Sequence, residues 1–190
     1  MMNFDPNVYK AGNQNWMITQ AGNKDLFVAN SSGLLRYNGA DWQLNPIPNK
    51  TIVRSVLAVD SLIFTGAYME IGYWQENDYG LLEYTSLLPR FPDPIADGEQ
   101  FWHMEQVEDV LVFQSFEGLY SYHLKENKIK RWELPHQASV TNLFRVGDLI
   151  YFQLMEAGLF VIQKGRIKEV IPYREMVDVE IMHLYRHQGL

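Results

Sequence analysis

Three glutamates are the residues of this sequence whose spacing most clearly suggests chemistry. Glu70, Glu117 and Glu156 stand at nearly equivalent places, each just before an apolar run that is typical of a strand. If the loops that carry them lie on one rim of the fold, their carboxylates converge and can accept hydrogen bonds from a polar ligand. The alternative is that each glutamate only solvates its own turn. Two of them could hydrolyse a glycoside only at a controlled separation, which a sequence does not supply.

Aromatic and amide side chains beside these glutamates favour ligand binding over catalysis. A flat apolar face next to hydrogen-bonding groups is what the surface of a sugar requires of a protein. The candidate ligand-binding residues in these loops are Asn30, Tyr68, Glu70, Phe116, Glu117 and Glu156.

The other reactive residue types form no recognisable catalytic or metal centre. His183 and His187 are four residues apart, but no Asp or Glu is placed as a third ligand, and the chain has no cysteine. Ser31–Gly33 is typical of a turn and lacks the G-x-S-x-G pattern of a strained nucleophile. The glycines of 66–72 lack the lysine and the following helix of a phosphate-binding loop. We therefore expect no catalytic residue, no metal and no cofactor.

The charge of the chain excludes several classes of partner. The net charge is −7 and the pI is near 5.2, with no basic cluster, so neither nucleic acid nor an anionic membrane is an expected partner. No apolar run approaches the roughly 18 residues of a membrane-spanning helix. The first 16 residues have no basic region followed by an apolar one, so a leader peptide is not expected within this sequence.

The hydrophobic pattern predicts many short antiparallel strands. β-branched and aromatic residues alternate with polar ones, and Gly, Asn, Asp or Pro interrupts the pattern about every 8–12 residues. The stretch 26–42 predicts three strands joined by turns at Asn30–Gly33 and Asn38–Gly39. An Asn-Gly pair between apolar runs predicts a tight hairpin in which both residues adopt positive φ.

The same unit recurs about every forty residues, which is typical of a β-propeller. Gln14–Trp16 resembles Gln100–Trp102, and similar strands begin at Gly33, Gly118 and Gly158, with Glu70 at the corresponding place. We expect an all-β chain, 1–190, that forms a single propeller segment of four-stranded antiparallel blades in an incomplete ring. The expected blades are 15–48, 51–89, 99–135 and 140–173, with the start of a fifth at 177–190. The alternative is a β-sandwich with chance similarity between hairpins.

The tryptophans recur with the unit, so we expect them to pack between blades rather than to serve as ligand platforms. They are Trp16, Trp42, Trp74, Trp102 and Trp132.

Three stretches resemble the start of a large family, the sensor ectodomains of Bacteroidetes signalling proteins built of two-component-regulator propeller repeats. They are 9–20 (YKAGNQNWMITQ), 26–56 (LFVANSSGLLRYNGADWQLNPIPNKTIVRSV) and 64–74 (FTGAYMEIGYW). The resemblance covers about 4–190. It implies a leader, about fourteen blades in two seven-bladed propellers, a triple-tyrosine domain and a membrane helix. The output is a histidine kinase or a LuxR-type regulator of transcription.

The resemblance predicts a periplasmic, non-catalytic segment of such a regulator, which senses a ligand outside the cytoplasm. The expected ligand is glycan-derived or another small polar molecule. The expected protein partner is the remainder of the receptor, or a second copy of the chain at open blade edges. One alternative is a stand-alone propeller-type interaction module that assembles through its open blade edges, and another is a glycan-active enzyme.

Overall fold

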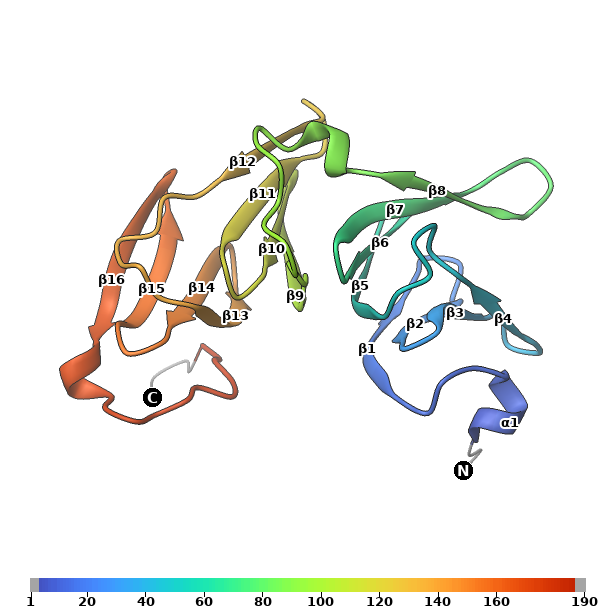
Figure 1. Ribbon diagram of the computed structural model, residues 1–190, viewed down its shortest axis with the longest axis horizontal. Helices are drawn as coiled ribbons and strands as arrows, with labels where there is room; N and C mark the ends of the chain where they lie inside the picture. The colour runs from blue at the N-terminus through green and yellow to red at the C-terminus, as the bar shows by residue number, and fades with distance from the viewer. Residues whose placement is uncertain (1–3, 187–190) are drawn as a thin grey trace. The chain divides into compact units, whose positions relative to one another are not determined.

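The computed structural model describes residues 4–186, which form two compact units. The first unit contains 4–89 and 94–102, and the second contains 90–93 and 103–186. Sixteen strands form four antiparallel sheets of four strands, and within each sheet the strands follow one another in chain order (Figure 1). This strand order is that of a propeller blade, so the predicted all-β class and the blade architecture are confirmed.

The first unit holds the first and second blades. A short helix, α1 (Pro6–Tyr9), precedes the first blade, and a 3-10 turn, Leu88–Arg90, follows the second and ends in the second unit. The strands of the first blade are β1 (Asn15–Gln20), β2 (Leu26–Asn30), β3 (Gly33–Tyr37) and β4 (Trp42–Asn45). Those of the second are β5 (Val53–Val59), β6 (Leu62–Ala67), β7 (Glu70–Glu76) and β8 (Leu82–Ser86).

The second unit holds the third and fourth blades and a 3-10 turn, Tyr173–Glu175. The third blade contains β9 (His103–Val107), β10 (Val110–Gln114), β11 (Leu119–His123) and β12 (Lys128–Arg131). The fourth contains β13 (Val140–Val146), β14 (Leu149–Leu154), β15 (Gly158–Gln163) and β16 (Arg166–Pro172). Between Phe4 and Arg186, no helix reaches the length and hydrophobicity that crossing a membrane requires.

The apolar faces of neighbouring blades pack on one another inside each unit. In the first unit, Phe27 and Leu34 of the first blade join Val56 and Ile63 of the second in one cluster. In the second unit, residues of the third and fourth blades form a corresponding cluster around Phe152. The middle strands are buried on both faces because each must cover two neighbouring layers, whereas the last strand of a blade is more exposed.

Two of the five tryptophans, Trp74 and Trp132, pack in apolar clusters between blades, as predicted, whereas Trp42 packs in a cluster of the first blade and α1. Trp74 is 4% exposed and donates from Nε1 to the Thr65 hydroxyl. Trp42 stacks on Tyr37, and Trp132 packs with the cluster of the second unit. Trp16 and Trp102 differ, because both contact an arginine.

A β-bulge recurs in the first strand of the first, second and fourth blades. The strand pairing skips one residue at Trp16 in β1, at Arg54 in β5 and at Thr141 in β13. A bulge inserts one extra residue and re-aims its side chain away from the regular alternation of a strand. The repeated bulge therefore gives each of these blades one specially oriented side chain.

The second, third and fourth blades are each tied to chain that lies well beyond them in sequence. The Ser55 hydroxyl donates to the carbonyl of Phe101, 46 residues later. The side-chain amide of Gln114 donates to the backbone carbonyl of Val140, and the side-chain amide of Gln153 donates to that of Val179. In both cases the acceptor lies 26 residues later. In these three blades a side chain near the end of the second strand, or on the first strand beside it, thus holds the segment that follows the blade.

The loop at 38–41 differs from the predicted hairpin, and the predicted fifth blade begins in a described stretch where no strand is present. The Asn38–Gly39 turn is not a two-residue hairpin, because Tyr37 pairs with Trp42 and leaves a four-residue loop. Only Gly39 has positive φ there (95°), and the Asn38 side chain accepts from the amides of Ala40 and Asp41. Residues 177–186 contain no strand and 187–190 lie outside the described residues, so the start of a fifth blade stays a prediction.

Candidate ligand site

The most distinctive polar feature of the first unit is an arginine that contacts two nearly perpendicular indole rings. The Arg54 Cζ atom lies 4.1 Å from the ring centroid of Trp16 and 4.3 Å from that of Trp102. The two ring centroids are 6.1 Å apart and the ring planes meet at 81°. Both contacts lie within the range of a cation–π interaction. We call these three residues the Trp–Arg–Trp cluster.

The backbone places the members of the cluster side by side. Trp16 and Arg54 are the bulged residues of β1 and β5, so both leave the regular alternation of their strands. Residues 99–102 run beside the end of β6, where Tyr68 pairs with Gln100 and the amide of Phe101 donates to the carbonyl of Ala67. This pairing brings Trp102 to the arginine.

The absence of a side chain at Gly66 permits that close approach. A Cβ atom at this position would lie 2.5 Å from the Ser55 Oγ and 2.7 Å from the Phe101 Cβ, which are distances too short for real contacts. The hydrogen bond from the Ser55 hydroxyl to the Phe101 carbonyl crosses the space that a larger residue would occupy. Gly66 therefore sets the spacing between the strand of Arg54 and the segment of Trp102.

Hydrogen bonds fix two side chains of the cluster. The Arg54 Nε donates to the Gln100 Oε1 at 3.1 Å. The Trp16 Nε1 donates to the Ser31 hydroxyl at 3.2 Å, and that hydroxyl donates in turn to Gln14. Trp16 nevertheless remains 40% exposed. The cluster is thus ordered but open to solvent, as a binding surface must be.

The charge of Arg54 is not balanced by any carboxylate among residues 4–186. Burial lowers the pKa of its guanidinium from the ordinary value, because desolvation disfavours the charged form. A guanidinium still carries its proton at neutral pH. The cluster therefore presents a positive charge between aromatic surfaces in a chain whose net charge is −7.

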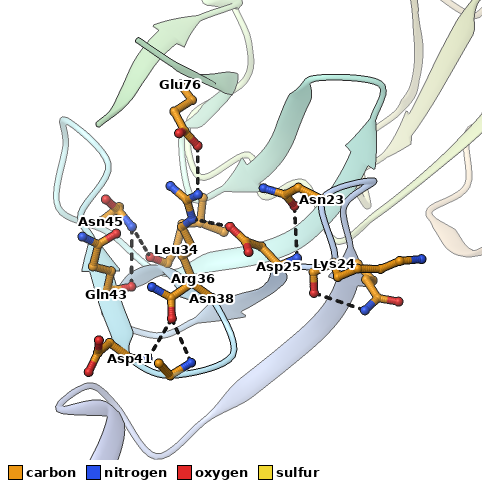
Figure 2. A network of polar contacts seen from close by, with 12 residues as sticks. Asn23, Lys24, Asp25, Leu34, Arg36, Asn38, Asp41, Gln43, Asn45 and Glu76 are labelled. Atoms are coloured by element: carbon orange, nitrogen blue, oxygen red, sulfur yellow. Dashed lines mark hydrogen bonds and ion pairs between the residues drawn. The ribbon is translucent and has the colours of Figure 1, made fainter. Parts of the chain in front are cut away.

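Arg36, in contrast, is held by two carboxylates at a different place in the same unit. Figure 2 shows its guanidinium between Asp25 and Glu76. The Nε atom lies 2.6 Å from Asp25 and the Nη2 atom lies 2.8 Å from Glu76. Asp25 precedes β2 and Glu76 ends β7, so Arg36 joins the first blade to the second. Its charge is fully engaged in structure.

The structure makes Asn30 a loop-forming residue. Its side chain is fully buried and donates to the carbonyl of Gly12 and to the side chain of Asn15, both at 2.7 Å. Its Oδ1 accepts from the amide of Ser32 at 2.8 Å. These bonds fix the turn between β2 and β3 and hold the segment that leads into β1.

Glu70 is also buried, at 7% exposure, and one carboxylate oxygen accepts three hydrogen bonds. The donors are the Ser86 hydroxyl at 2.7 Å, the backbone amide of Ile71 at 2.9 Å and the Tyr84 hydroxyl at 3.2 Å. Burial and the negative charge of Glu70 both raise the pKa of Tyr84 far above its ordinary value. Glu70 thus ties β7 to the outer strand β8. Tyr68, its neighbour in the predicted site, is 42% exposed.

Phe116 and Glu117 line a groove of about 920 Å³ in the second unit. Both lie in the loop between β10 and β11, and both are exposed. The carbonyl of Glu117 accepts from Arg131, and Lys130 lies 4.0 Å from the ring centroid of Trp132. The other described residues that line the groove are Pro92, Asp93, Ile129, Glu133, Leu134, His136, Gln137, Ala138 and Ser139. The structure therefore brings these two predicted residues together.

Glu156 lies exposed at the turn between β14 and β15 with φ of 54° and is not among the residues that line the groove. Glu70 belongs to the first unit, whereas Glu117 and Glu156 belong to the second. The convergence of the three glutamates on one rim stays a prediction. Residues 4–186 contain no group of three His, Cys, Asp or Glu side chains that could hold a metal ion. Of the histidine pair, His187 lies outside the described residues.

Arg54 and Gln100 are not among the site residues that the sequence predicts. Gln14–Trp16 resembles Gln100–Trp102 in sequence, and the residue of the second blade at the bulge that corresponds to Trp16 is Arg54. The connection 87–98 lengthens the spacing between the second and third blades, which hid this equivalence from a constant repeat length. Alignment of the positions next to the start of each incoming strand would have grouped Trp16, Arg54 and Trp102.

Comparison with known proteins identifies the fold. No protein-family profile and no curated protein match the sequence. Among solved structures, the chain is similar to the extracellular domain of BT4673, a proposed hybrid two-component system of B. thetaiotaomicron. The identity is 19% and the TM-score 0.61, over 84% of this chain and 21% of that one. For the extracellular domain of BT3049, from the same organism and described in the same terms, the values are 16%, 0.63, 86% and 24%.

The chain is also similar to streptogramin B lyase, at 14% identity and a TM-score of 0.60, over 81% of this chain and 53% of that one. The chain spans less than a quarter of the length of the two B. thetaiotaomicron domains. At these identities the likeness establishes the propeller fold. The resemblance to sensor ectodomains that the sequence predicts is confirmed at that level, and the same fold also occurs in an enzyme.

Proposed function

We propose that this chain is a ligand-sensing segment of a periplasmic propeller domain in a bacterial signal-transduction regulator. The observation that carries the proposal is the Trp–Arg–Trp cluster, an ordered and partly exposed set of aromatic and cationic groups. Bulged residues commonly stand next to functional sites. The likeness to extracellular domains of two-component systems supports the same role.

We infer a binding function without catalysis. The groups around Arg54 are an amide, a serine hydroxyl and indole rings, and the Ser31 hydroxyl is engaged with Trp16 and Gln14. A nucleophile needs an adjacent general base, and none of these groups is one. The buried carboxylate of Glu70 already accepts three hydrogen bonds inside the second blade.

In this proposal the ligand acts by shifting an equilibrium between two arrangements of the receptor ectodomain. A ligand can do so only by binding one arrangement more tightly than the other. The cluster joins residues of β1 and β5 to the segment that leads into β9, so a ligand bound there contacts three chain segments at once. The protein partner is the remainder of the receptor, or a second copy of the chain at an open blade edge.

Tryptophan fluorescence tests the proposal directly, because Trp16 is both a candidate contact and the reporter. We expect the emission of the 190-residue chain to change saturably on addition of at least one of cellotetraose, xylotetraose and tetragalacturonate. The Trp16→Ala variant loses that binding in isothermal titration calorimetry. The control is Tyr79→Ala, which removes an exposed aromatic ring from the same unit and keeps the affinity. Absence of binding by the unmodified chain to all three saccharides contradicts the proposal.

A further inference from the structure

We propose that Arg54 recognises a carboxylate, so that the ligand of the Trp–Arg–Trp cluster is an acidic saccharide rather than a neutral one. This inference rests on the proposed function and specifies its ligand class. It starts from a difference between two arginines of the first unit. Arg36 contacts two carboxylates, whereas Arg54 contacts none among residues 4–186.

The hydrogen-bonding capacity of Arg54 is mostly unused. A guanidinium has five N–H donors, one on Nε and four on the two Nη atoms. The Nε–H donates to Gln100, and within 4–186 the Nη atoms of this residue have no hydrogen-bond acceptor. Two parallel N–H groups match the two oxygens of a carboxylate and form a bidentate pair with it. The unused donors thus define an acceptor of that geometry.

The tryptophans strengthen such a pair. The rings of Trp16 and Trp102 lie 4.1 Å and 4.3 Å from the Arg54 Cζ atom and shield part of the guanidinium, which is half-buried. An ion pair gains strength as the effective dielectric constant around it falls. The exposed part of Trp16 also offers an apolar surface beside the charge, on which a saccharide ring can lie.

The charge of the whole chain makes the inference specific. At a net charge of −7, the chain as a whole does not attract anions, so general electrostatic attraction does not explain binding of an acid. Any preference for a charged saccharide over its neutral counterpart must come from a local cation. Arg54 supplies that cation inside the candidate site.

The test compares trigalacturonate with its fully methyl-esterified form, two ligands that differ in charge but not in sugar rings. We expect calorimetry to show that the 190-residue chain binds the acid at least about tenfold more tightly than the ester, and that added salt weakens binding of the acid. Arg54→Met removes the difference between the ligands. Arg54→Lys keeps a charge without the bidentate fork and retains part of the difference.

The controls separate the possible explanations. Arg145→Met removes an exposed arginine of the second unit, and the preference for the acid persists in this variant. Circular dichroism and thermal melting show whether each variant is folded. Propionate, a carboxylate without a sugar ring, binds far more weakly than trigalacturonate if the indole surface takes part. Equal binding of propionate contradicts the saccharide assignment.

Three further outcomes would overturn the inference. Equal affinity for the acid and the ester contradicts the role of the carboxylate but leaves the proposed function intact. Persistence of the preference in folded Arg54→Met assigns the charge recognition to another residue. Failure of both ligands to bind overturns this inference, and it overturns the proposed function as well if the neutral saccharides also fail.

Discussion

Arg36 and Arg54 lie in the same compact unit and both are shielded from much of the solvent, yet their charges are satisfied in opposite ways. Arg36 of β3 sits between Asp25 and Glu76 (Figure 2). Arg54 of β5 sits against two indole rings and one amide. The first arrangement is complete without a ligand, and the second leaves donors unused. The comparison separates a structural cation from one that is available for recognition.

The largest effect is expected when Arg36 is removed. In Arg36→Met, the Asp25 carboxylate, whose side chain is 10% exposed, becomes a buried charge without a partner. Breaking a buried pair in this way costs roughly 3–5 kcal/mol. We expect a loss of about 3 kcal/mol, because the second partner, Glu76, is solvent-accessible. Urea unfolding measures the loss. The double variant Asp25→Asn with Arg36→Met recovers part of it, and equal stability of Arg36→Met and the unmodified chain would show that the pair is not structural.

An intermediate effect that depends on pH is expected at Tyr84. Burial and Glu70 raise the pKa of Tyr84 above the ordinary value of about 10, so the folded chain keeps this proton more tightly than the unfolded chain. The associated stability is complete below about pH 10 and is lost as the pH rises above it, by up to about 1.4 kcal/mol per pH unit.

Tyr84→Phe removes this pH dependence and costs about 1 kcal/mol at neutral pH, because Glu70 loses one of its three donors. The measurement is the free energy of unfolding between pH 8 and pH 11. Tyr79→Phe, at a tyrosine that is 88% exposed, serves as the control and keeps the slope of the unmodified chain. An unchanged slope in Tyr84→Phe would show that its hydroxyl ionises equally in both states.

The smallest effect on stability is expected at Arg54. Arg54→Met loses two cation–π contacts and one hydrogen bond, but leaves no carboxylate unpaired. Since methionine packs against indole rings, we expect a loss below about 1 kcal/mol, measured in urea beside Arg36→Met. A loss as large as that of Arg36→Met would make Arg54 a structural residue and would remove the contrast on which the proposed ligand site depends.

The sequence predicted the blades because their signals are local. Alternating hydrophobicity and turn residues recur in every blade. Strand pairing confirms the predicted equivalence of Glu70 with Gly33. Ala67 pairs with Glu70 as Asn30 pairs with Gly33. The Asn38–Gly39 turn was wrong in detail, because the Asn38 side chain closes a longer loop that the dipeptide alone does not reveal.

The candidate site was harder to predict because it depends on contacts between distant segments. Glu70 had the residue type of a ligand-binding group, but its hydrogen-bond donors Tyr84 and Ser86 come from the outer strand β8. Arg54 lies 38 positions from one of its indole partners and 48 from the other. Its environment arises from strand bulges and from the pairing of residues 99–102 with the end of β6.

The hydrogen bonds that tie the second, third and fourth blades to later chain have a consequence for synthesis on the ribosome. Gln114 finds its acceptor only once Val140 has been made, and Gln153 finds its acceptor only once Val179 has been made. A growing chain therefore completes each blade after the following segment has left the exit tunnel. The finished blade then presents an ordered apolar face on which the next one packs, so that folding proceeds in the direction of translation.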